Sequence, residues 1–234
     1  MTNSTSKIRP KHRLTTRLWH WINALALIVL FMSGLNIFNA HPRLYWGEAG
    51  FNPGEAWLIL ERFPHWLTIP GYYSLADARL WHLFFAWVLA VGLTLFLVIS
   101  LMNKHLQRDI HITRPEWRLS SIKADIAAHL KFDFNHGDRN YNYNVLQKFA
   151  YALVIFILIP LMIFTGITMS PAMNANWPWL LDVFGGRQSA RSLHFIAAWG
   201  LFAFFVVHIL LVLLSGPISQ MRDMIFGGKE TGHE

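Results

Sequence analysis

The sequence predicts an all-α integral membrane protein, a single domain over residues 1–234 in which four helices form a bundle across the bilayer. Charged residues make up only 14% of the chain, against about a quarter in ordinary soluble proteins, while 54% are hydrophobic. Four stretches of about twenty residues or more contain no Asp, Glu, Lys or Arg. Cysteine is absent, which excludes disulfides, thiolate zinc sites and cysteine-ligated iron–sulfur clusters.

Each uncharged stretch is long enough to cross a membrane. At a rise of about 1.5 Å per residue, about twenty residues cover the hydrocarbon core of about 30 Å. Since lipid offers no hydrogen-bond partners to a bare backbone, these stretches cross as helices. Within the third stretch, Pro160 predicts a kink because its ring removes a backbone donor. The predicted spans are residues 18–38, 80–103, 149–171 and 192–217.

The distribution of Lys and Arg predicts that both termini are cytoplasmic. Fifteen of the 20 basic residues lie in the N-terminal arm, in the connection between the second and third spans, or in the tail. Cytoplasmic loops are enriched in Lys and Arg, so this side faces the cytoplasm of a bacterial inner membrane. The basic charge therefore has a topological explanation, and nucleic-acid binding is not needed to account for it.

The loops on the opposite side are rich in aromatic residues. Residues 39–79 hold three Trp, and their segment Glu55–Leu67 is predicted to form a short helix on the membrane surface. Together with residues 172–191 they form a neutral to acidic aromatic surface. Such a surface suits docking of a periplasmic partner protein, and it equally suits an aromatic belt at the membrane boundary.

Four histidines lie within or at the edges of the spans, and their depths sort them into two pairs. His20 and His208 lie toward the cytoplasmic leaflet, while His82 and His194 lie toward the outer one. His194 and His208, fourteen residues apart, share one helix face at depths about 21 Å apart. Each depth can therefore offer two axial imidazoles to a planar cofactor, which without Cys indicates a non-covalent b-type haem.

Two other features of the spans bear on this site. The third span contains no His and is expected only to wall the bundle. Small residues inside the spans either let a porphyrin approach the backbone or serve ordinary helix packing. These small residues are Gly34, Gly92, Gly166 and Gly200.

The motifs around these histidines resemble a known family. They are Arg-Leu-Trp-His-Trp at residues 17–21, Arg-Leu-Trp-His at 79–82, and Ser-Leu-His at 192–194 followed by His208. They resemble the di-haem cytochrome b subunits of membrane-bound formate dehydrogenase, uptake nickel–iron hydrogenase and thiosulfate reductase. The resemblance implies two haem b groups with bis-His iron. His82 and His194 would hold the outer haem, and His20 and His208 the inner one.

The resemblance also implies partners. Residues 185–194 look most like the thiosulfate-reductase-type branch, whose members work with molybdopterin oxidoreductases. The chain would then transfer electrons between a periplasmic redox partner and the quinone pool, with the substrate chemistry on the partner subunit. A hydrogenase or formate dehydrogenase subunit is the alternative within the family. The alternatives outside it are a membrane carrier, which should have acidic residues in its spans, and a structural anchor without haem.

A quinone site is implied at the entrance to the third span. Tyr143, Asn144, Gln147 and Lys148 resemble the Tyr-Asn-x-x-Gln-Lys segment before the third helix of formate dehydrogenase cytochrome subunits. By that resemblance Asn144 donates to a quinone carbonyl, Tyr143 or Gln147 lies nearby, and His208 closes the pocket. An Asn-rich helix cap with Lys148 as a membrane anchor explains the same residues.

Three arginines stand three residues before a proposed ligand: Arg17, Arg79 and Arg191. Haem propionates are anions that point to the membrane surface, so these guanidinium groups are candidate propionate partners. In the competing interpretation, these arginines only set the orientation of the chain in the membrane, or extend their side chains to the membrane surface.

Overall fold

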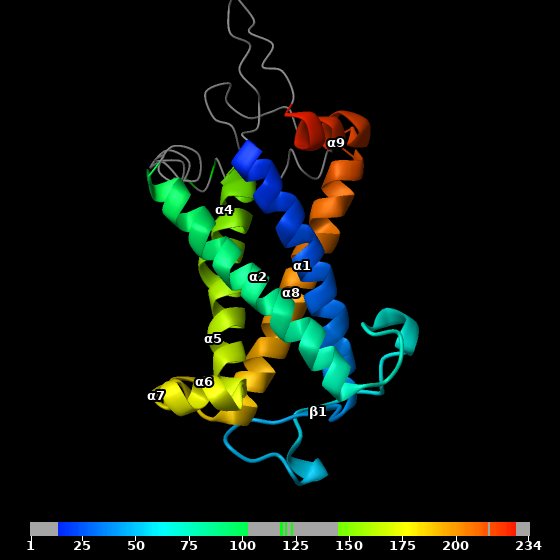
Figure 1. Cartoon of the computed structure of the whole chain (residues 1–234), viewed down its shortest axis with the longest axis vertical. Helices are drawn as coiled ribbons and strands as arrows, with labels where there is room; N and C mark the ends of the chain where they lie inside the picture. The colour runs from blue at the N-terminus through cyan, green and yellow to red at the C-terminus, as the bar shows by residue number, and fades with distance from the viewer. Residues whose placement is uncertain are drawn as a thin grey trace, which may run out of the picture.

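The computed structural model describes residues 14–102, 118, 120, 123, 145–214 and 216–227. Four helical segments run along the long axis of the molecule (Figure 1), and each is long and apolar enough to cross a membrane. This confirms the four predicted spans. The segments are α1 (Leu14–Asn39), α2 (Leu75–Met102), Val145–Met169 and α8 (Arg187–Leu214).

The helices extend beyond the uncharged stretches and take in charged residues at their ends. A long charged side chain near a helix end can keep its head group at the membrane surface, so the charge does not force the helix to stop. The charged residues included are Arg17, Asp77, Arg79, Lys148, Arg187 and Arg191.

The third span changes its helical hydrogen bonding in the turn before Pro160. It consists of α4 (Val145–Leu153), a π-helical turn η4 (Val154–Leu158) and α5 (Ile159–Met169). The backbone N–H of Ile159 donates to the carbonyl of Val154, one residue further back than in an α-helix. Pro160 has no N–H to continue the regular ladder, so the interruption predicted at this residue takes the form of a π-turn.

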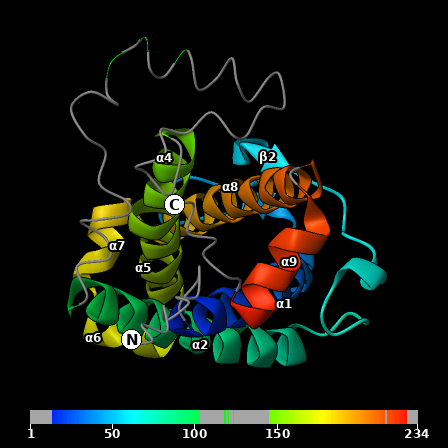
Figure 2. The same ribbon diagram turned by 90° about the horizontal axis from the view of Figure 1, so that it is seen from above.

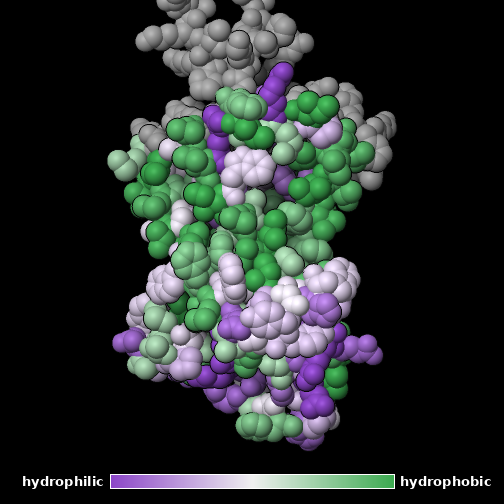
Figure 3. Space-filling view, turned by 45° about the vertical axis from the view of Figure 1, so that its right-hand side comes forward, coloured by the Kyte–Doolittle hydropathy of each residue, from purple (hydrophilic) through white to green (hydrophobic). Residues whose placement is uncertain are grey.

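The bundle consists of two helix pairs (Figure 1, Figure 2). Helix α1 packs on α2, and α5 packs on α8. Only 11% of the most apolar 18-residue stretch of α8 is buried, although the helix packs on α5. On the face seen in Figure 3, hydrophobic residues form a broad band over the middle of the helices. The buried core holds Leu30, Leu89, Leu93, Val154, Ile159 and Leu201.

One end of the bundle, here called the loop end, carries the connection from α1 to α2 and the connection from α5 to α8. It contains the antiparallel strands β1 (Arg43–Leu44) and β2 (Leu58–Ile59) and the 3-10 turns η1 (Pro53–Glu55) and η2 (His65–Leu67). Two short helices, α6 (Pro171–Asn176) and α7 (Trp179–Phe184), lie at the same end in Figure 1.

The predicted surface helix over Glu55–Leu67 is wrong. The segment instead holds the end of η1, strand β2 and η2. The N–H of Trp57 donates to the carbonyl of Leu44, and that of Leu60 to the carbonyl of Pro42. These bonds to the preceding segment satisfy backbone groups that a helix would have paired locally.

The loop end is bound to the first turn of α8. The carbonyl of Gly47 accepts from the N–H groups of Gln188 and Ser189, which have no partner within the helix. The N–H of Gly47 donates to Ser189 Oγ at 2.7 Å. Ser192 Oγ donates to the carbonyl of Tyr45 at 2.6 Å and accepts from the indole N–H of Trp57 at 2.9 Å. The loop therefore caps α8.

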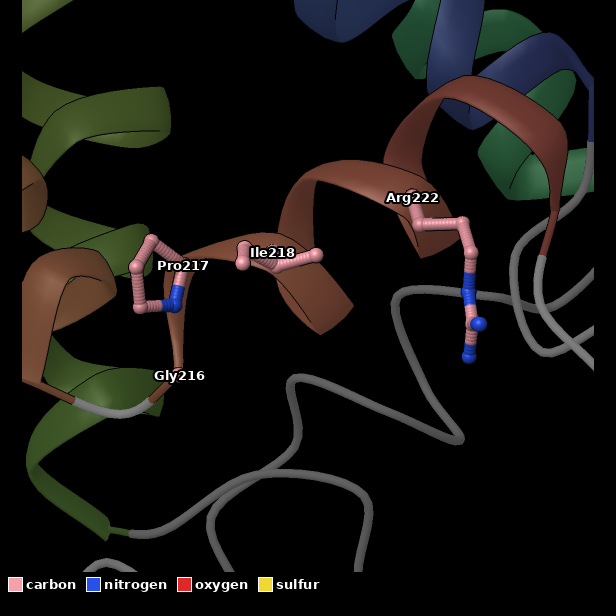
Figure 4. A pocket seen from close by; sticks show the side chains of 4 residues that line it. All are labelled: Gly216, Pro217, Ile218 and Arg222. Atoms are coloured by element: carbon pink, nitrogen blue, oxygen red, sulfur yellow. The ribbon is translucent and has the colours of Figure 1, made fainter.

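The opposite end, here called the α9 end, carries the start of α1 and a short final helix, α9 (Pro217–Phe226). The chain turns at Gly216, which has φ +94°, and a cavity of about 360 Å³ lies beside the turn (Figure 4). The side chains of Arg17 and Trp21 donate to the last carbonyls of α9. These bonds join α9 to the start of α1.

The contact between loop and α8 yields a stability prediction. Gly186 has φ +104°, and an added Cβ would lie 2.6 Å from the carbonyl group of Gly47. Gly186→Ala should destabilise the fold by about 1–3 kcal/mol, because the left-handed backbone is strained and the loop must move. Gly71→Ala is the control, since an added Cβ there meets nothing within 4 Å. Equal thermal unfolding of the two variants in detergent, followed by circular dichroism, would contradict the expectation.

Candidate functional site

The structure brings the four span histidines together in two pairs. The ring centroids of His20 and His208 are 6.1 Å apart with an interplanar angle of 57°. Those of His82 and His194 are 6.2 Å apart at 56°. All four side chains are half-buried. In each pair, two imidazoles that are tilted relative to one another thus leave a gap of nearly the same width between them.

The width of the gap fits one iron between two imidazoles. With metal–nitrogen bonds of about 2 Å and a ring radius of about 1.1 Å, two axial rings should have centroids about 6.2 Å apart. In the described part of the chain, no three His, Asp or Glu gather to hold a metal ion. A pair is sufficient for haem, because the porphyrin supplies the other four nitrogens. The residues present therefore fit a bis-His haem at either position.

The two pairs lie between the two helix pairs of the bundle. His20 of α1 and His82 of α2 come from one helix pair, and both of their partners come from α8 of the other. On α8 the two positions are about 21 Å apart along the axis. The buried core residue Leu201 lies seven residues from each of them. One apolar layer therefore separates two equivalent gaps.

Aromatic side chains join α1 to α8 between the two pairs. Phe31 stacks on Phe202 with ring centroids 4.6 Å apart at 9°, and it meets Trp199 edge-on at 5.3 Å. At the α9 end, Phe204 stacks on His208 with centroids 5.9 Å apart at 15°. The contacts of Phe31 hold α1 against α8, the two helices that carry His20 and His208, whereas the contact of Phe204 lies within α8.

The pair His82–His194 lies toward the loop end and is here called the loop-end pair. The sequence analysis did not predict the hydrogen-bond partners of the Nδ1 atoms in this pair. Ser33 Oγ lies 3.0 Å from His82 Nδ1, and Thr165 Oγ1 lies 2.8 Å from His194 Nδ1. Thr165 belongs to the third span, so the expectation that this span only walls the bundle is wrong. A signal was present, because each hydroxyl residue directly precedes a glycine inside an apolar span.

The glycines inside the spans divide into two kinds. An added Cβ on Gly34 would lie 3.4 Å from His82 Cε1, and one on Gly166 would lie 3.5 Å from His194 Cε1. These two glycines let helix backbone approach an imidazole edge. Gly92 instead faces Trp19, and Gly200 faces side-chain atoms of Leu158, which is helix packing.

The three candidate propionate partners have different surroundings. The guanidinium of Arg191 donates to the backbone carbonyls of Arg43 and His41, and so holds the loop end. That of Arg17 donates to carbonyls of α9. Arg79 is exposed on the first turns of α2. A propionate role for these residues stays a prediction, and in Arg17 and Arg191 it would use the remaining donors.

His41 lies where the loop meets α8. Its ring stacks on that of Tyr45 with centroids 5.9 Å apart. Burial lowers the pKa of His41, and the nearby guanidinium groups of Arg191 and Arg43 lower it further.

Part of the predicted quinone site lies within the residues that the structure describes. Gln147 is half-buried in the first turn of α4, and Lys148 beside it is buried, with 1% of its surface exposed. Tyr143 and Asn144 lie outside the described residues. The quinone site therefore stays a prediction.

Comparison with known proteins gives consistent relatives. The chain is 30% identical over 198 residues to a putative protein-methionine-sulfoxide reductase subunit, YedZ1, of Azospira oryzae, covering 85% of this chain and 87% of the relative. It is 25% identical over 229 residues to a probable Ni/Fe-hydrogenase B-type cytochrome subunit of Cupriavidus necator, covering 90% and 82%. A subunit of the same name from Azotobacter vinelandii is 22% identical over 214 residues, covering 87% and 80%. No solved structure matches the chain.

The family model described as prokaryotic cytochrome b561 matches residues 11–227, which includes all four spans and both histidine pairs. Membership accounts for the apolar helices. The chain belongs to the prokaryotic cytochrome b561 family, whose members are bacterial membrane proteins that bind b-type haem.

Proposed function

We propose that this chain is the electron-transfer subunit of a redox complex in the bacterial inner membrane. It holds two haem b groups, one at each histidine pair, and connects a redox enzyme on the outer side with the quinone pool. The observation that carries this proposal is the pair of equivalent gaps, 6.1 Å and 6.2 Å between ring centroids. When bound, haem iron alternates between the ferric and ferrous states and so passes one electron at a time.

Two sites explain the length of the spans better than one. The imidazoles of α8 lie about 21 Å apart along an axis that crosses a hydrocarbon core of about 30 Å. A single site would leave most of that thickness without an electron carrier. The apolar layer around Leu201 excludes water and ions between the two positions.

The charges in the spans favour an electron carrier over a proton or ion carrier. A carrier of ions needs acidic or other charged groups within the membrane. Asp77 is the only acidic residue in the described spans, and it lies near the start of α2 at the loop end. Its carboxylate accepts from the hydroxyls of Tyr72 and Ser74, so it caps local structure.

The names of the relatives support a redox enzyme as the partner, and they name two kinds of enzyme. One relative is named as a subunit of a methionine-sulfoxide reductase and another as a subunit of a Ni/Fe-hydrogenase. We propose a periplasmic molybdopterin oxidoreductase, with a hydrogenase or formate dehydrogenase as the alternative. The partner docks on the loop end, where large aromatic side chains are exposed: Trp46, Phe51, Trp57 and Trp66.

The quinone is proposed to react at the α9 end, on the other side of the bundle from the partner. Gln147 and Lys148 open the third span there, after Tyr143 and Asn144. Amide and phenol groups can donate to the two carbonyls of a quinone. With both termini cytoplasmic, electrons would cross the bilayer between the loop end and this site.

The ligand assignment predicts selective losses of haem. His194→Ala and His82→Ala should each remove the loop-end component of the b-type spectrum, because iron keeps only one protein ligand. His208→Ala and His20→Ala should each remove the other component. Haem content and a potentiometric titration of the purified protein measure both. His65→Ala, an exposed loop-end histidine, is the control and should keep both components.

Two results would contradict this assignment. If the purified wild-type protein gives no reduced-minus-oxidised b-type spectrum, the proposed function fails. If His20→Ala removes the same component as His194→Ala, the function stands but the pairing is wrong.

The docking surface is tested with two exposed phenylalanines at opposite ends. Phe51, at the loop end, is 88% exposed, and Phe226, in α9, is 78% exposed. Phe51→Ser should weaken association with the redox enzyme about tenfold or more, since aromatic anchors dominate many interfaces. Phe226→Ser should not. The measurement is the amount of enzyme subunit per haem that co-purifies from native membranes, and equal amounts would place docking elsewhere.

The quinone assignment is tested with Asn144→Leu. This variant should slow oxidation of the reduced haems by added quinone and leave haem content unchanged, because a hydrogen-bond donor to the quinone is lost. Asn176→Leu changes an exposed amide at the loop end and is the matched control. Stopped-flow absorbance follows the oxidation. Unchanged rates in Asn144→Leu would return this segment to a capping role.

A further inference from the structure

The hydroxyl of Ser33 has one proton to donate, and a backbone carbonyl accepts it. Ser33 Oγ donates to the carbonyl of Val29 at 2.6 Å, one turn back in α1, and lies 3.2 Å from the carbonyl of Leu30. With that proton donated to the carbonyl, the contact with His82 Nδ1 at 3.0 Å uses an oxygen lone pair, and the imidazole Nδ1–H donates to the serine.

The same accounting applies at Thr165. Its Oγ1 donates to the carbonyl of Leu161 at 2.6 Å and lies 3.3 Å from that of Met162. The 2.8 Å contact with His194 Nδ1 is then again an N–H donated by the ring. Both hydroxyls occupy the same place relative to their own helix and their histidine.

The tautomer determines the role of the other ring nitrogen. With Nδ1 protonated, Nε2 is the nitrogen with a free lone pair.

A glycine follows each hydroxyl residue and lies at the Cε1 edge of the same ring. An added Cβ on Gly34 would be 3.4 Å from that edge of His82, and one on Gly166 would be 3.5 Å from that of His194. Each pair of residues, Ser33–Gly34 on α1 and Thr165–Gly166 on α5, is here called a hydroxyl–glycine cradle. The hydroxyl contacts the Nδ1 edge of an imidazole, and the glycine lies beside its Cε1 edge.

We propose that the two hydroxyl–glycine cradles are positioning elements of the loop-end haem site and that they lower its midpoint potential. Each fixes its histidine as the Nδ1–H tautomer, with Nε2 directed into the gap. Donation of Nδ1–H to an oxygen raises the electron density at Nε2, which stabilises ferric over ferrous iron. The proposal rests on the proposed function, because it assumes haem at this pair.

The pair at the α9 end is held differently. The His208 ring stacks on Phe204, and His20 meets Trp21 edge-on with centroids 5.0 Å apart. Within the described part of the chain, no Ser or Thr hydroxyl bonds to the His208 ring. The influence of the cradles is therefore expected at one of the two haems.

Hydroxyl-free variants test the proposal. Ser33→Ala and Thr165→Val should each shift the midpoint potential of the loop-end haem to more positive values, with a larger shift in the double variant. The other haem should keep its potential. The largest g value in the electron paramagnetic resonance spectrum of the loop-end ferric haem should also change, because it depends on the angle between the imidazole planes.

Two kinds of control separate positioning from packing. Thr168→Val removes another buried hydroxyl of α5, which donates to the carbonyl of Thr165 at 2.6 Å, and should leave both potentials unchanged. Ser33→Thr and Thr165→Ser keep the hydroxyl and should keep the potential and g value of the wild type. Loss of the loop-end haem in the hydroxyl-free variants, with retention in these conservative ones and in Thr168→Val, also supports the proposal.

Three outcomes overturn it. The first is an unchanged potential and g value in both hydroxyl-free variants. The second is an equal change in the conservative variants or in Thr168→Val. The third is a shift of the other haem by the same amount. Each can occur while the wild type binds two haems and His194→Ala removes one, so failure of this proposal is distinguishable from failure of the proposed function.

Discussion

An imidazole inside an apolar bundle needs a partner for each of its two ring nitrogens, and the architecture of this protein depends on how that demand is met. Unpaired polar groups are costly in lipid. At the loop end, Ser33 and Thr165 bond to the Nδ1 edges. The ring centroids of His82 and His194 are 6.2 Å apart, and the iron of the proposed haem in that gap would bond to the other nitrogen of each ring. The cost of burying the rings would then become a driving force for binding haem.

The two gaps lie between helix pairs that touch each other sparingly. Within each pair, α1 packs on α2 and α5 on α8. Between them, aromatic contacts such as Phe31 on Phe202 supply part of the joining surface. Since so little of α8 is buried by protein, a bound porphyrin at each gap would contribute much of the apolar contact between the halves. Binding of the proposed cofactors would therefore be coupled to the stability of the bundle.

The spans and the two histidine pairs could be predicted from sequence because both follow from chain geometry. Absence of charge marks a crossing helix, and a spacing of fourteen residues places His194 and His208 on one face. The cradles could not be predicted with the same ease. A serine or threonine in an apolar helix commonly bonds to its own backbone, and sequence does not show which residue of another helix its lone pairs meet. The strand pairing that replaces the expected helix over Glu55–Leu67 is likewise a contact with the preceding segment, made by Trp57 and Leu60.

The contribution of α8 to both pairs has a consequence for biogenesis. Spans insert in chain order, and α8 is the last of the four. Until it enters the membrane, His20 and His82 have no facing imidazole, and the loop that caps α8 has nothing to bind. Both histidine pairs are therefore completed late and by the same event. A chain truncated before α8 would contain three of the four spans and neither histidine pair.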